Sequence, residues 1–412
     1  MSALHSASAQ APALPNFLVP RVDRYRLRVA EAHILVGAEP GPGAVLLKTN
    51  DYLGLGNHAE ILDAQAQAIH ASGNGLMMSS VFLNGPNPQW AFQDALAQHM
   101  LAEAAVVLQS GYMANVGLIQ SIAEEETPVY VDMIAHASLW AGIRAANATA
   151  RPFRHNNIDH LHRQLKKHGP GVVVIDSVYS TNGSIAPISD VVDLAEAYGC
   201  AIVVDESHSL GTHGPRGAGL VVELGLQERV HFRTASLAKA FCGRGGVVAC
   251  SESFAEYMTY EAFPIIFSSA VLPHEFLAFA KTLEIVRRDE WRRRRLHGNA
   301  RMLREALDGL GYNVDTSESQ IIALESGSEK QTIILRDALE ARGVFGSPFC
   351  APATPKNRAC IRFSVQSDLS RDDLERVIEV CAEVREEAGL ARWPSTRRKA
   401  RASSFDPVSL AA

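Results

Sequence analysis

The sequence predicts an α/β protein, with a mostly parallel sheet in a large domain and a smaller α+β domain toward the C-terminus. Two observations predict the large domain. Short apolar runs of strand length recur between residues 100 and 250, and helical patterns separate several of them. One helical pattern, 187–199, begins with Pro and ends with Gly, as helices often do. Strands that alternate with helices form βαβ units, whose parallel sheet is covered on both faces.

The elements follow in order along the chain. Residues 1 to about 20 are rich in Ala, Ser and Pro and are expected to form a mobile arm, and residues 21–34 are expected to form a helix. After the turn-rich NDYLGLGN segment, residues 59–73 predict a helix with a Gly stop. The expected strands lie near residue 107 and at 129–132, 172–176, 201–205, 231–235 and 246–250.

The second, smaller domain follows a helical and very basic stretch, residues 275–312. We expect strands near 320–324 and 360–365, and helices near 330–342 and 371–388. The predicted organisation has four parts: an N-terminal arm and helix (1–45), a large α/β domain (46–290), a small α+β domain (291–393) and a flexible tail (394–412).

Composition excludes several classes of protein. Of 412 residues, 47% are hydrophobic and 20% are charged, which argues against intrinsic disorder. A formal net charge of −6 argues against a dedicated nucleic-acid binder. Six scattered cysteines form neither a CxxC metal site nor a disulfide framework, so we expect a reducing, cytoplasmic location. We expect neither a membrane span nor a signal peptide, because the sequence lacks a long apolar stretch and a basic start.

Polar side chains gather where the expected strands end. In an open parallel sheet, ligands bind beyond the carboxyl ends of the strands. Any one of these residues alone is more often a helix cap or a turn residue, but the whole set indicates a binding site. The set comprises Asp132, His136, Asp176, Ser177, Ser180, Asp205, Glu206, His208, Ser236 and Lys239.

A lysine among small residues and an aspartate at the end of a buried strand together suggest pyridoxal phosphate. This cofactor needs a lysine for its Schiff base and a carboxylate to keep its pyridine nitrogen protonated, and Lys239 and Asp205 are of the right types. Its phosphate needs hydroxyl groups and backbone N–H groups. Ser236 and the Gly111-Tyr112 turn ahead of a helix can supply them.

The segments GYMANVG, HASLWAG, VYSTNG, DESHSLG and SLAKAF, together with NDYLGL at 50–55, resemble the α-oxoamine synthases. These are fold-type I pyridoxal-phosphate enzymes, so the resemblance, which covers about residues 45–390, implies a seven-stranded type of sheet. The family condenses an amino acid with an acyl-CoA and usually releases CO₂. Its members include 8-amino-7-oxononanoate synthase, 5-aminolevulinate synthase, 2-amino-3-ketobutyrate CoA ligase and serine palmitoyltransferase.

The resemblance implies a role for each matching residue around the cofactor ring. Lys239 would form the Schiff base and move the proton during the reaction. Asp205 would pair with the pyridine nitrogen, and His136 would stack on the ring face. His208 and Ser180 would approach the ring hydroxyl.

The same resemblance implies a phosphate site that two subunits share. Gly111, Tyr112 and Ser236 would hold the phosphate from one subunit. In the family a neighbouring subunit also contributes, and the matching segment FPIIFSSA makes Ser268 and Ser269 the candidates. The expected assembly is therefore a homodimer with a shared active site.

The substrate side departs from the family pattern. Members usually carry an Arg before a PPTVP-like run, where it binds the carboxylate of the amino acid, but here Cys350 occupies that position. Arg362, in a probable strand, is the first candidate to replace it, and Arg358 is the second. Asn50 matches a family residue near the substrate. Alternatively, a large amino donor is anchored through its own side chain.

A second departure points to one branch of the family. The segments SSVFLNG, HASLWAG, PFRHN and CAPATPKNR are most similar to enzymes that make α-hydroxyketone quorum-sensing autoinducers. That branch joins a medium-chain acyl-CoA to S-adenosylmethionine or 2-aminobutyrate. Five apolar residues replace a polar family segment and could form an apolar tunnel for the acyl chain, or they could only pack the core. They are Met77, Met78, Val81, Phe82 and Leu83.

Other functions find less support. Gly54, Gly56 and Ala59 make a G-x-G-x-x-A match of the kind found in nicotinamide-dependent oxidoreductases, but no acidic residue follows about 20 positions later. The histidines at 155, 160, 162 and 168 fit a solvated helix better than a metal site. The arginines at 292–295 have acidic neighbours and fit an ion-paired helix, although contact with coenzyme A phosphates is an alternative. An intact Lys239 and Asp205 argue against a non-catalytic binding module.

Overall fold

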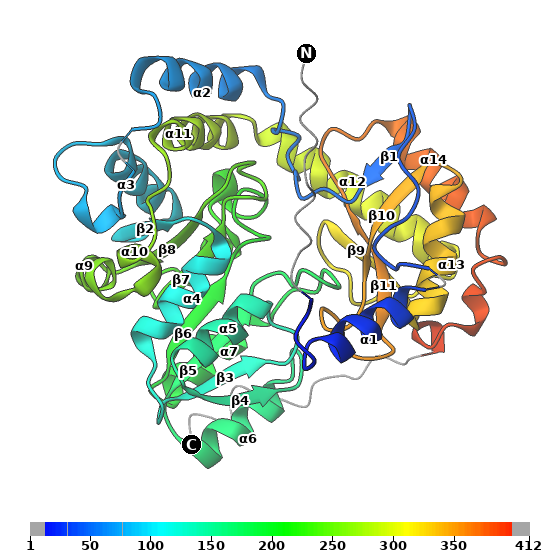
Figure 1. Ribbon diagram of the computed structural model, residues 1–412, viewed down its shortest axis with the longest axis horizontal. Coiled ribbons are helices and arrows are strands. Elements are labelled where there is room, and N and C mark those ends of the chain that lie inside the picture. Colours follow the sequence, from blue (N-terminus) through cyan, green and yellow to red (C-terminus); the bar gives the residue numbers. More distant parts are fainter. Residues whose placement is uncertain (1–12, 31, 76, 398–412) are drawn as a thin grey trace.

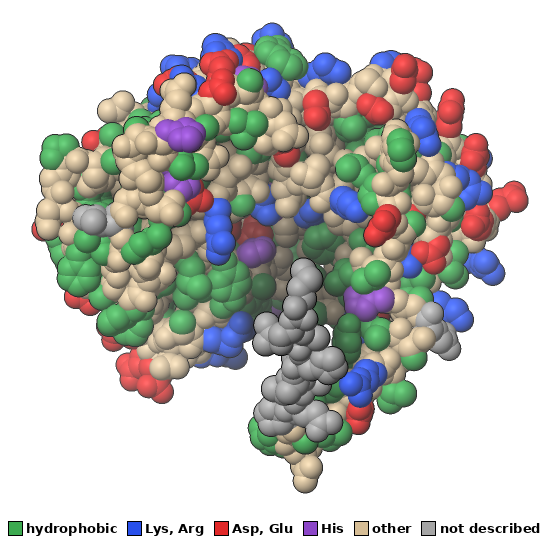
Figure 2. Space-filling model, turned by 45° about the horizontal axis from the view of Figure 1, so that its top comes forward, with side chains coloured by type: hydrophobic (Ala, Val, Ile, Leu, Met, Phe, Trp, Pro, Cys, Tyr) green, Lys and Arg blue, Asp and Glu red, His purple; other side chains and the backbone are tan. Residues whose placement is uncertain are grey.

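Two sheets organise the chain in a computed structural model that describes residues 13–30, 32–75 and 77–397. The large sheet lies on one side of the molecule in Figure 1 and the small sheet lies on the other, and the long helix α12 (Glu290–Gly309) runs between the two parts. Figure 2 shows that the surface is hollowed between them. Within the described residues, no helix is both long enough and apolar enough to span a membrane.

The large sheet has seven strands in the order β2-β8-β7-β6-β5-β3-β4. Six strands run in one direction, and β8 alone is antiparallel to its two neighbours. The predicted α/β class with a mostly parallel sheet is confirmed. The strands are β2 (Ala104–Leu108), β3 (Pro128–Asp132), β4 (Thr149–Phe153), β5 (Val172–Asp176), β6 (Ala201–Asp205), β7 (Phe232–Ser236) and β8 (Gly246–Cys250).

Helices cover both faces of this sheet, so that a central strand such as β5 is buried at every position. In β5, Val172 and Val174 join a core that includes residues of α4 and α5. Val173 and Ile175 face the opposite way and join a core that includes residues of α6 and α7. The helices of this part are α2 (Ala59–Ser72), α3 (Pro88–Met100), α4 (Gly111–Ile122), α5 (Ala137–Ala145), α6 (Ile158–His168), α7 (Ile188–Ala197), α8 (Leu220–Glu223), α9 (Glu252–Glu261), α10 (Phe263–Ile266) and α11 (Pro273–Arg288), with 3₁₀ turns η1 (Ser80–Phe82) and η2 (Pro215–Gly217).

The small sheet has four strands in the order β1-β10-β11-β9. They are β1 (Val45–Leu47), β9 (Ile321–Gly327), β10 (Val344–Phe349) and β11 (Ala359–Ser364), with helices α13 (Glu329–Glu340) and α14 (Arg371–Glu383). β1 comes from the N-terminal part of the chain and pairs in parallel with β10, so that Val45 lies opposite Val344. The sequence did not predict that this N-terminal strand joins the C-terminal sheet.

The N-terminal helix α1 (Val19–Val29) lies beside the small sheet and helix α13 in Figure 1. It contributes no buried residue, and its Arg28 pairs with Glu329 at 2.7 Å. Residues 1–12, most of the expected arm, lie outside the described residues.

The expected flexible tail, residues 394–412, begins inside the folded part. The turn η3 (Leu390–Arg392) ends just before it, and the turn η4 (Ser395–Arg397) lies within it. Ser395 is buried, and its hydroxyl donates to the carbonyl of Glu325 at 2.5 Å. The packed chain therefore continues past residue 394, and residues 398–412 lie outside the described part.

Candidate active site

A cavity of about 210 Å³ opens where β5, β6 and β7 end and α4 begins. It brings together seven of the residues that the sequence predicted for the cofactor: Gly111, Tyr112, His136, Asp205, His208, Ser236 and Lys239. Ser110, Asn115, Asp176 and Ser207 complete the lining. Six members of the predicted set of polar strand ends line this one cavity, where the carboxyl ends of the strands meet. Asp132, Ser177, Ser180 and Glu206 do not line it.

Asp205, the last residue of β6, is held rigidly inside this cavity. One carboxylate oxygen accepts from Asn115 Nδ2 at 2.6 Å, and the other accepts from the backbone N–H of Ser207 at 2.8 Å. The amide of Asn115 is fixed in turn, because its Oδ1 accepts from the hydroxyl of Thr234 at 2.6 Å. Sequence reasoning missed Asn115, although it lies within the GYMANVG segment.

A second carboxyl group, that of Asp176, lies beside Asp205. The two residues are register partners on neighbouring strands, and both line the cavity. Asp176 accepts from the backbone N–H of His136 at 3.2 Å. Burial, the charge of Asp205 and the charge of Asp132 raise the pKa of Asp176 well above its usual value. This shift favours the protonated form of Asp176 beside Asp205.

Two neutral histidines lie in the cavity lining. Burial lowers the pKa of His136, and its Nδ1 lies 2.7 Å from the hydroxyl of Ser138. Burial, followed by the charges of Lys239 and Arg362, lowers the pKa of His208 well below its usual value. A neutral imidazole suits stacking on a ring and hydrogen bonding to a ring hydroxyl.

Tyr52 connects the NDYLGL segment to this site. Its hydroxyl lies 2.7 Å from His208 Nδ1 and also donates to Asn50 Oδ1 at 3.3 Å. Burial raises the pKa of Tyr52 to about 12, so the hydroxyl keeps its proton. Tyr52 is a second residue that sequence reasoning missed, because its partner lies 156 residues away.

Lys239 lies in the loop that follows β7. Burial and the charge of Arg362 lower the pKa of its amine, and the charge of Asp205 opposes them. A lowered pKa makes the neutral, nucleophilic amine more available. The loop is fixed by Cys242, which has a left-handed backbone, donates its N–H to the carbonyl of Lys239 at 3.0 Å and donates its thiol to Asp51 at 2.9 Å.

The N-terminus of α4 and Ser236 form a cradle for an anion. Ser110 caps the helix, and its hydroxyl accepts from the N–H of Met113 at 3.2 Å. Gly111 must lack a side chain, because a Cβ there would lie 2.6 Å from Cβ of Ser236. Free N–H groups at a helix N-terminus favour a phosphate. Together with Lys239, Asp205 and the neutral histidines, this donor set fits pyridoxal phosphate.

Three predicted cofactor residues lie outside the cavity lining. Ser180 follows β5, and its carbonyl accepts from Arg362 Nη1 at 2.9 Å. Ser268 and Ser269 are exposed after α10, where the carbonyl of Ser269 accepts from Gln109 Nε2 at 2.7 Å. A contribution from Ser268 and Ser269 to a neighbouring subunit stays a prediction.

The structure separates the two candidate arginines on the substrate side. Arg362 on β11 is only 5% exposed, and it donates to Asn50 Oδ1 at 3.0 Å. Its charge acts on Lys239 and His208, so it lies on the side of the reacting atoms. Arg358 is bound elsewhere, in an ion pair with Glu325 at 2.8 Å.

The position of the missing family arginine is also occupied. Cys350 Sγ lies 3.3 Å from Arg28 Nη2, and the same nitrogen pairs with Glu329. An arginine at position 350 would place two like charges together. Cysteine at this position leaves room for Arg28 of the N-terminal helix to pair with Glu329.

The apolar segment that replaces the polar family segment does not form core. Met77 and Phe82 are 67% and 64% exposed. Met78, Phe82 and Leu83 line a separate cavity of about 480 Å³ together with residues such as Val271. Its assignment to the acyl chain therefore stays a prediction.

Histidines near residue 160 and arginines on α12 have structural partners. In the part of the chain that the structure describes, no group of three metal-ligating side chains comes together. His160, His162 and His168 lie on helix α6, as expected, and His155 pairs with Asp132. Arg292 and Arg293 on α12 pair with Asp289 and Glu290, which confirms the expected ion-paired helix.

Comparison with known proteins decides the family. Residues 42–380 match the model of the family described as aminotransferase class I and II. The chain belongs to the α-oxoamine synthases, within that family. It is 46% identical to the CAI-1 autoinducer synthase of Vibrio campbellii over 375 residues, which cover 90% of this chain and 95% of that protein. It is 33% identical to an 8-amino-7-oxononanoate synthase of Bacillus pumilus, with coverage of 82% and 87%.

This α-oxoamine synthase also shares its fold with a solved lysine-to-alanine variant of the serine palmitoyltransferase from S. paucimobilis, which contains a bound PLP–myriocin aldimine. The TM-score is 0.84 at 25% identity, and the match covers 92% of this chain and all of that one. The cofactor is pyridoxal 5′-phosphate, as the sequence predicted, and the enzyme is an acyltransferase that condenses an amino acid with an acyl-CoA.

Proposed function

We propose that this α-oxoamine synthase joins a medium-chain acyl-CoA to S-adenosylmethionine or 2-aminobutyrate. The reaction releases CoA and CO₂ and gives an α-aminoketone that serves as the precursor of a quorum-sensing autoinducer. The observation that carries this proposal is the 46% identity to an autoinducer synthase over nearly the whole chain, against 33% to an 8-amino-7-oxononanoate synthase. The exchange of the family arginine for Cys350 also supports an unusual amino donor.

The proposed roles follow from the geometry of the cavity. When it is bound, pyridoxal phosphate withdraws electrons from Cα of the amino donor. Asp205, held by Asn115 and Ser207, keeps a proton on the pyridine nitrogen. Lys239 provides the covalent attachment and, with its lowered pKa, accepts the Cα proton at Nζ. The neutral His136 covers one face of the ring.

Product analysis tests the function directly. Purified enzyme is offered acetyl-, succinyl-, octanoyl- and decanoyl-CoA with S-adenosylmethionine, 2-aminobutyrate, glycine, alanine or serine, and the products are identified by mass spectrometry. We expect kcat/KM to be highest for octanoyl- or decanoyl-CoA with one of the first two donors. A preference for succinyl-CoA, or for glycine, alanine or serine as the donor, would contradict the proposal and favour another α-oxoamine synthase activity.

Arg362 is the residue that we propose to bind the carboxylate of the amino donor. It is buried, and its Nε lacks a hydrogen-bond partner among the described residues. A buried carboxylate needs a partner of opposite charge. We expect Arg362→Ala to raise the KM for the amino donor by about tenfold or more, as the loss of a charged hydrogen bond typically does.

The KM for acyl-CoA should change little in the same variant. Arg358→Ala is the matched control, because Arg358 is already paired with Glu325 at the surface. If both variants keep the donor KM of the wild-type enzyme, the carboxylate has another partner. A melting curve of each variant separates a binding defect from a loss of folding.

We also propose that the active site is shared across a homodimer. Ser268 and Ser269 are exposed and lie outside the cofactor cavity of their own chain, as expected of residues that contact the cofactor site of a neighbouring subunit. Light scattering should show a dimer. Co-expression of a Lys239→Ala chain with a Ser268→Glu/Ser269→Glu chain should restore about a quarter of wild-type activity, because half of the dimers then contain one complete site. If the activity is not restored, each active site is formed by residues of a single chain.

A further inference from the structure

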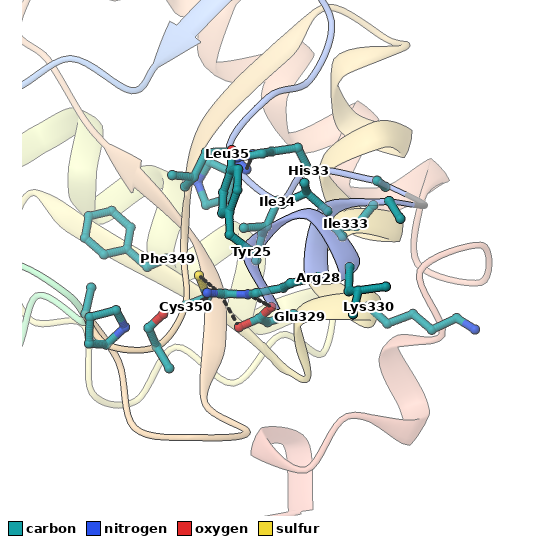
Figure 3. Close-up of a pocket in the computed structure, with 18 of the residues that line it drawn as sticks. Tyr25, Arg28, His33, Ile34, Leu35, Glu329, Lys330, Ile333, Phe349 and Cys350 are labelled. Atoms are coloured by element: carbon teal, nitrogen blue, oxygen red, sulfur yellow. Dashed lines mark hydrogen bonds and ion pairs between the residues drawn. The ribbon is translucent and has the colours of Figure 1, made fainter. Parts of the chain in front are cut away.

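A second cavity, of about 930 Å³, lies between α1, α13 and the end of β10. Its lining is mainly apolar and includes Leu27, Ile34, Leu35, Ile333, Ile334 and Phe349. Figure 3 shows Phe349 at one side of this cavity and Ile333 at the other. A volume of this order, with mostly apolar walls, is typical of small-molecule sites.

Two of the charged groups at this cavity already have partners. Arg28 and Glu329 pair with each other at 2.7 Å, and Arg28 also contacts Cys350 Sγ. Figure 3 shows this cluster, with Lys330 extending away from it. A ligand with many hydrogen-bonding groups would find few free partners here, whereas an alkyl chain needs none.

Phe349 connects this cavity to the substrate side of the active site. The centre of its ring lies 4.6 Å from the guanidinium carbon of Arg362, and the ring also lines the apolar cavity. Arg362 in turn contacts Asn50 and lowers the pKa of Lys239. Phe349 and Arg362 therefore place one end of the cavity beside the groups that act on the substrate.

We infer that this cavity, closed on one side by helix α1, binds the acyl chain of the acyl-CoA. The inference rests on the proposed function and assigns the acyl subsite to α1, α13 and Phe349. It differs from the expectation that residues 77–83 hold the chain, because those residues line another cavity. The docking of Arg28 on Cys350 explains why α1 stays in place although it contributes no buried residue.

The test changes the size of the cavity from one position of α13. Ile334 lines the cavity and is 36% exposed, so substitutions there need not disturb the core. Each methylene that loses its burial lowers binding about fourfold. We expect Ile334→Trp to lower kcat/KM for decanoyl-CoA by about tenfold or more, while the value for acetyl-CoA stays within about twofold. Ile334→Ala should shift the preference toward dodecanoyl-CoA.

Two controls make the outcome decisive. Leu224→Trp places the same bulk at an exposed leucine that belongs to no cavity lining given above, and it should leave the chain-length profile unchanged. Phe82→Trp fills the cavity of residues 77–83 instead. The inference is wrong if Phe82→Trp, and not Ile334→Trp, shortens the preferred chain, or if Ile334→Trp raises the KM for the amino donor or slows all acyl-CoAs equally.

A binding measurement without turnover completes the test. The affinity of decyl-CoA, a thioether that cannot transfer its chain, should fall in Ile334→Trp by a similar factor. Should Ile334→Trp fail to fold, as shown by circular dichroism, Ile334→Ala carries the test alone. If the wild-type enzyme itself prefers succinyl-CoA, the proposed function fails. If it prefers decanoyl-CoA and the Ile334 variants leave that preference unchanged, only the assignment of the cavity fails.

Discussion

Lys239→Ala should lower the rate of condensation by about 10²–10⁴-fold, because a positioned acid–base group contributes that much. The amine of Lys239 lines the cofactor cavity, and both burial and the charge of Arg362 lower its pKa. The variant should also lose the covalent link to pyridoxal phosphate. Borohydride reduction followed by peptide mapping should place the pyridoxyl group on Lys239 in the wild-type enzyme and on no lysine in the variant.

Lys166→Ala is a suitable control, since Lys166 is exposed on α6, which covers the sheet away from the cofactor cavity. It should keep the activity and the label. A labelled peptide that contains another lysine would show that the assignment is wrong. The assignment would also be wrong if Lys239→Ala kept the visible absorbance of the bound cofactor and full activity.

Asp205→Asn should lower the rate of condensation by about 10²–10³-fold, as the loss of one electrostatic stabiliser does in other active sites. The amide keeps the shape of the side chain but removes the charge that would hold a proton on the pyridine nitrogen. Binding of pyridoxal phosphate should weaken less than turnover, because the phosphate cradle and Lys239 remain. Absorbance titration with the cofactor and steady-state kinetics measure the two effects separately.

Asp176→Asn is the matched control, because Asp176 lines the same cavity and is the register partner of Asp205. Burial and the charge of Asp205 raise the pKa of Asp176 well above its usual value, which favours the neutral form of this carboxyl group. Replacing a neutral acid with an amide should therefore change the rate by less than about tenfold. Equal losses in both variants would show that the negative charge is not confined to Asp205.

The sheet was predictable where its strands are buried on both faces. A central strand such as β5, VVVID, is buried at every position and begins with four apolar residues, which stand out in the sequence. The edge strand β4 carries no such signal, because it reads TARPF and is only partly buried. β10 contains a glycine and a proline, and β1 has only three residues, so neither could be recognised before its partner was known.

The site residues were predictable where a reactive side chain lies at or just after the end of a buried strand. Asp205 is a carboxylate at the end of a strand, Lys239 is an amine shortly after one, and both line the cavity. Tyr52 and Asn115 act through hydrogen bonds to residues far away in the chain, which no local pattern reveals. The choice between Arg362 and Arg358 depended on which of them the fold buries.

The pairing of β1 with β10 has a consequence for how the chain folds. Val45 and Val344 lie about 300 residues apart, and the entropy lost on closing a chain segment rises with its length. Contacts between such distant residues slow folding. The strands of the large sheet all lie between residues 104 and 250, so during synthesis that sheet can form before β10 leaves the ribosome. Asn50 and Tyr52 follow β1 directly, so the substrate side of the site is completed last.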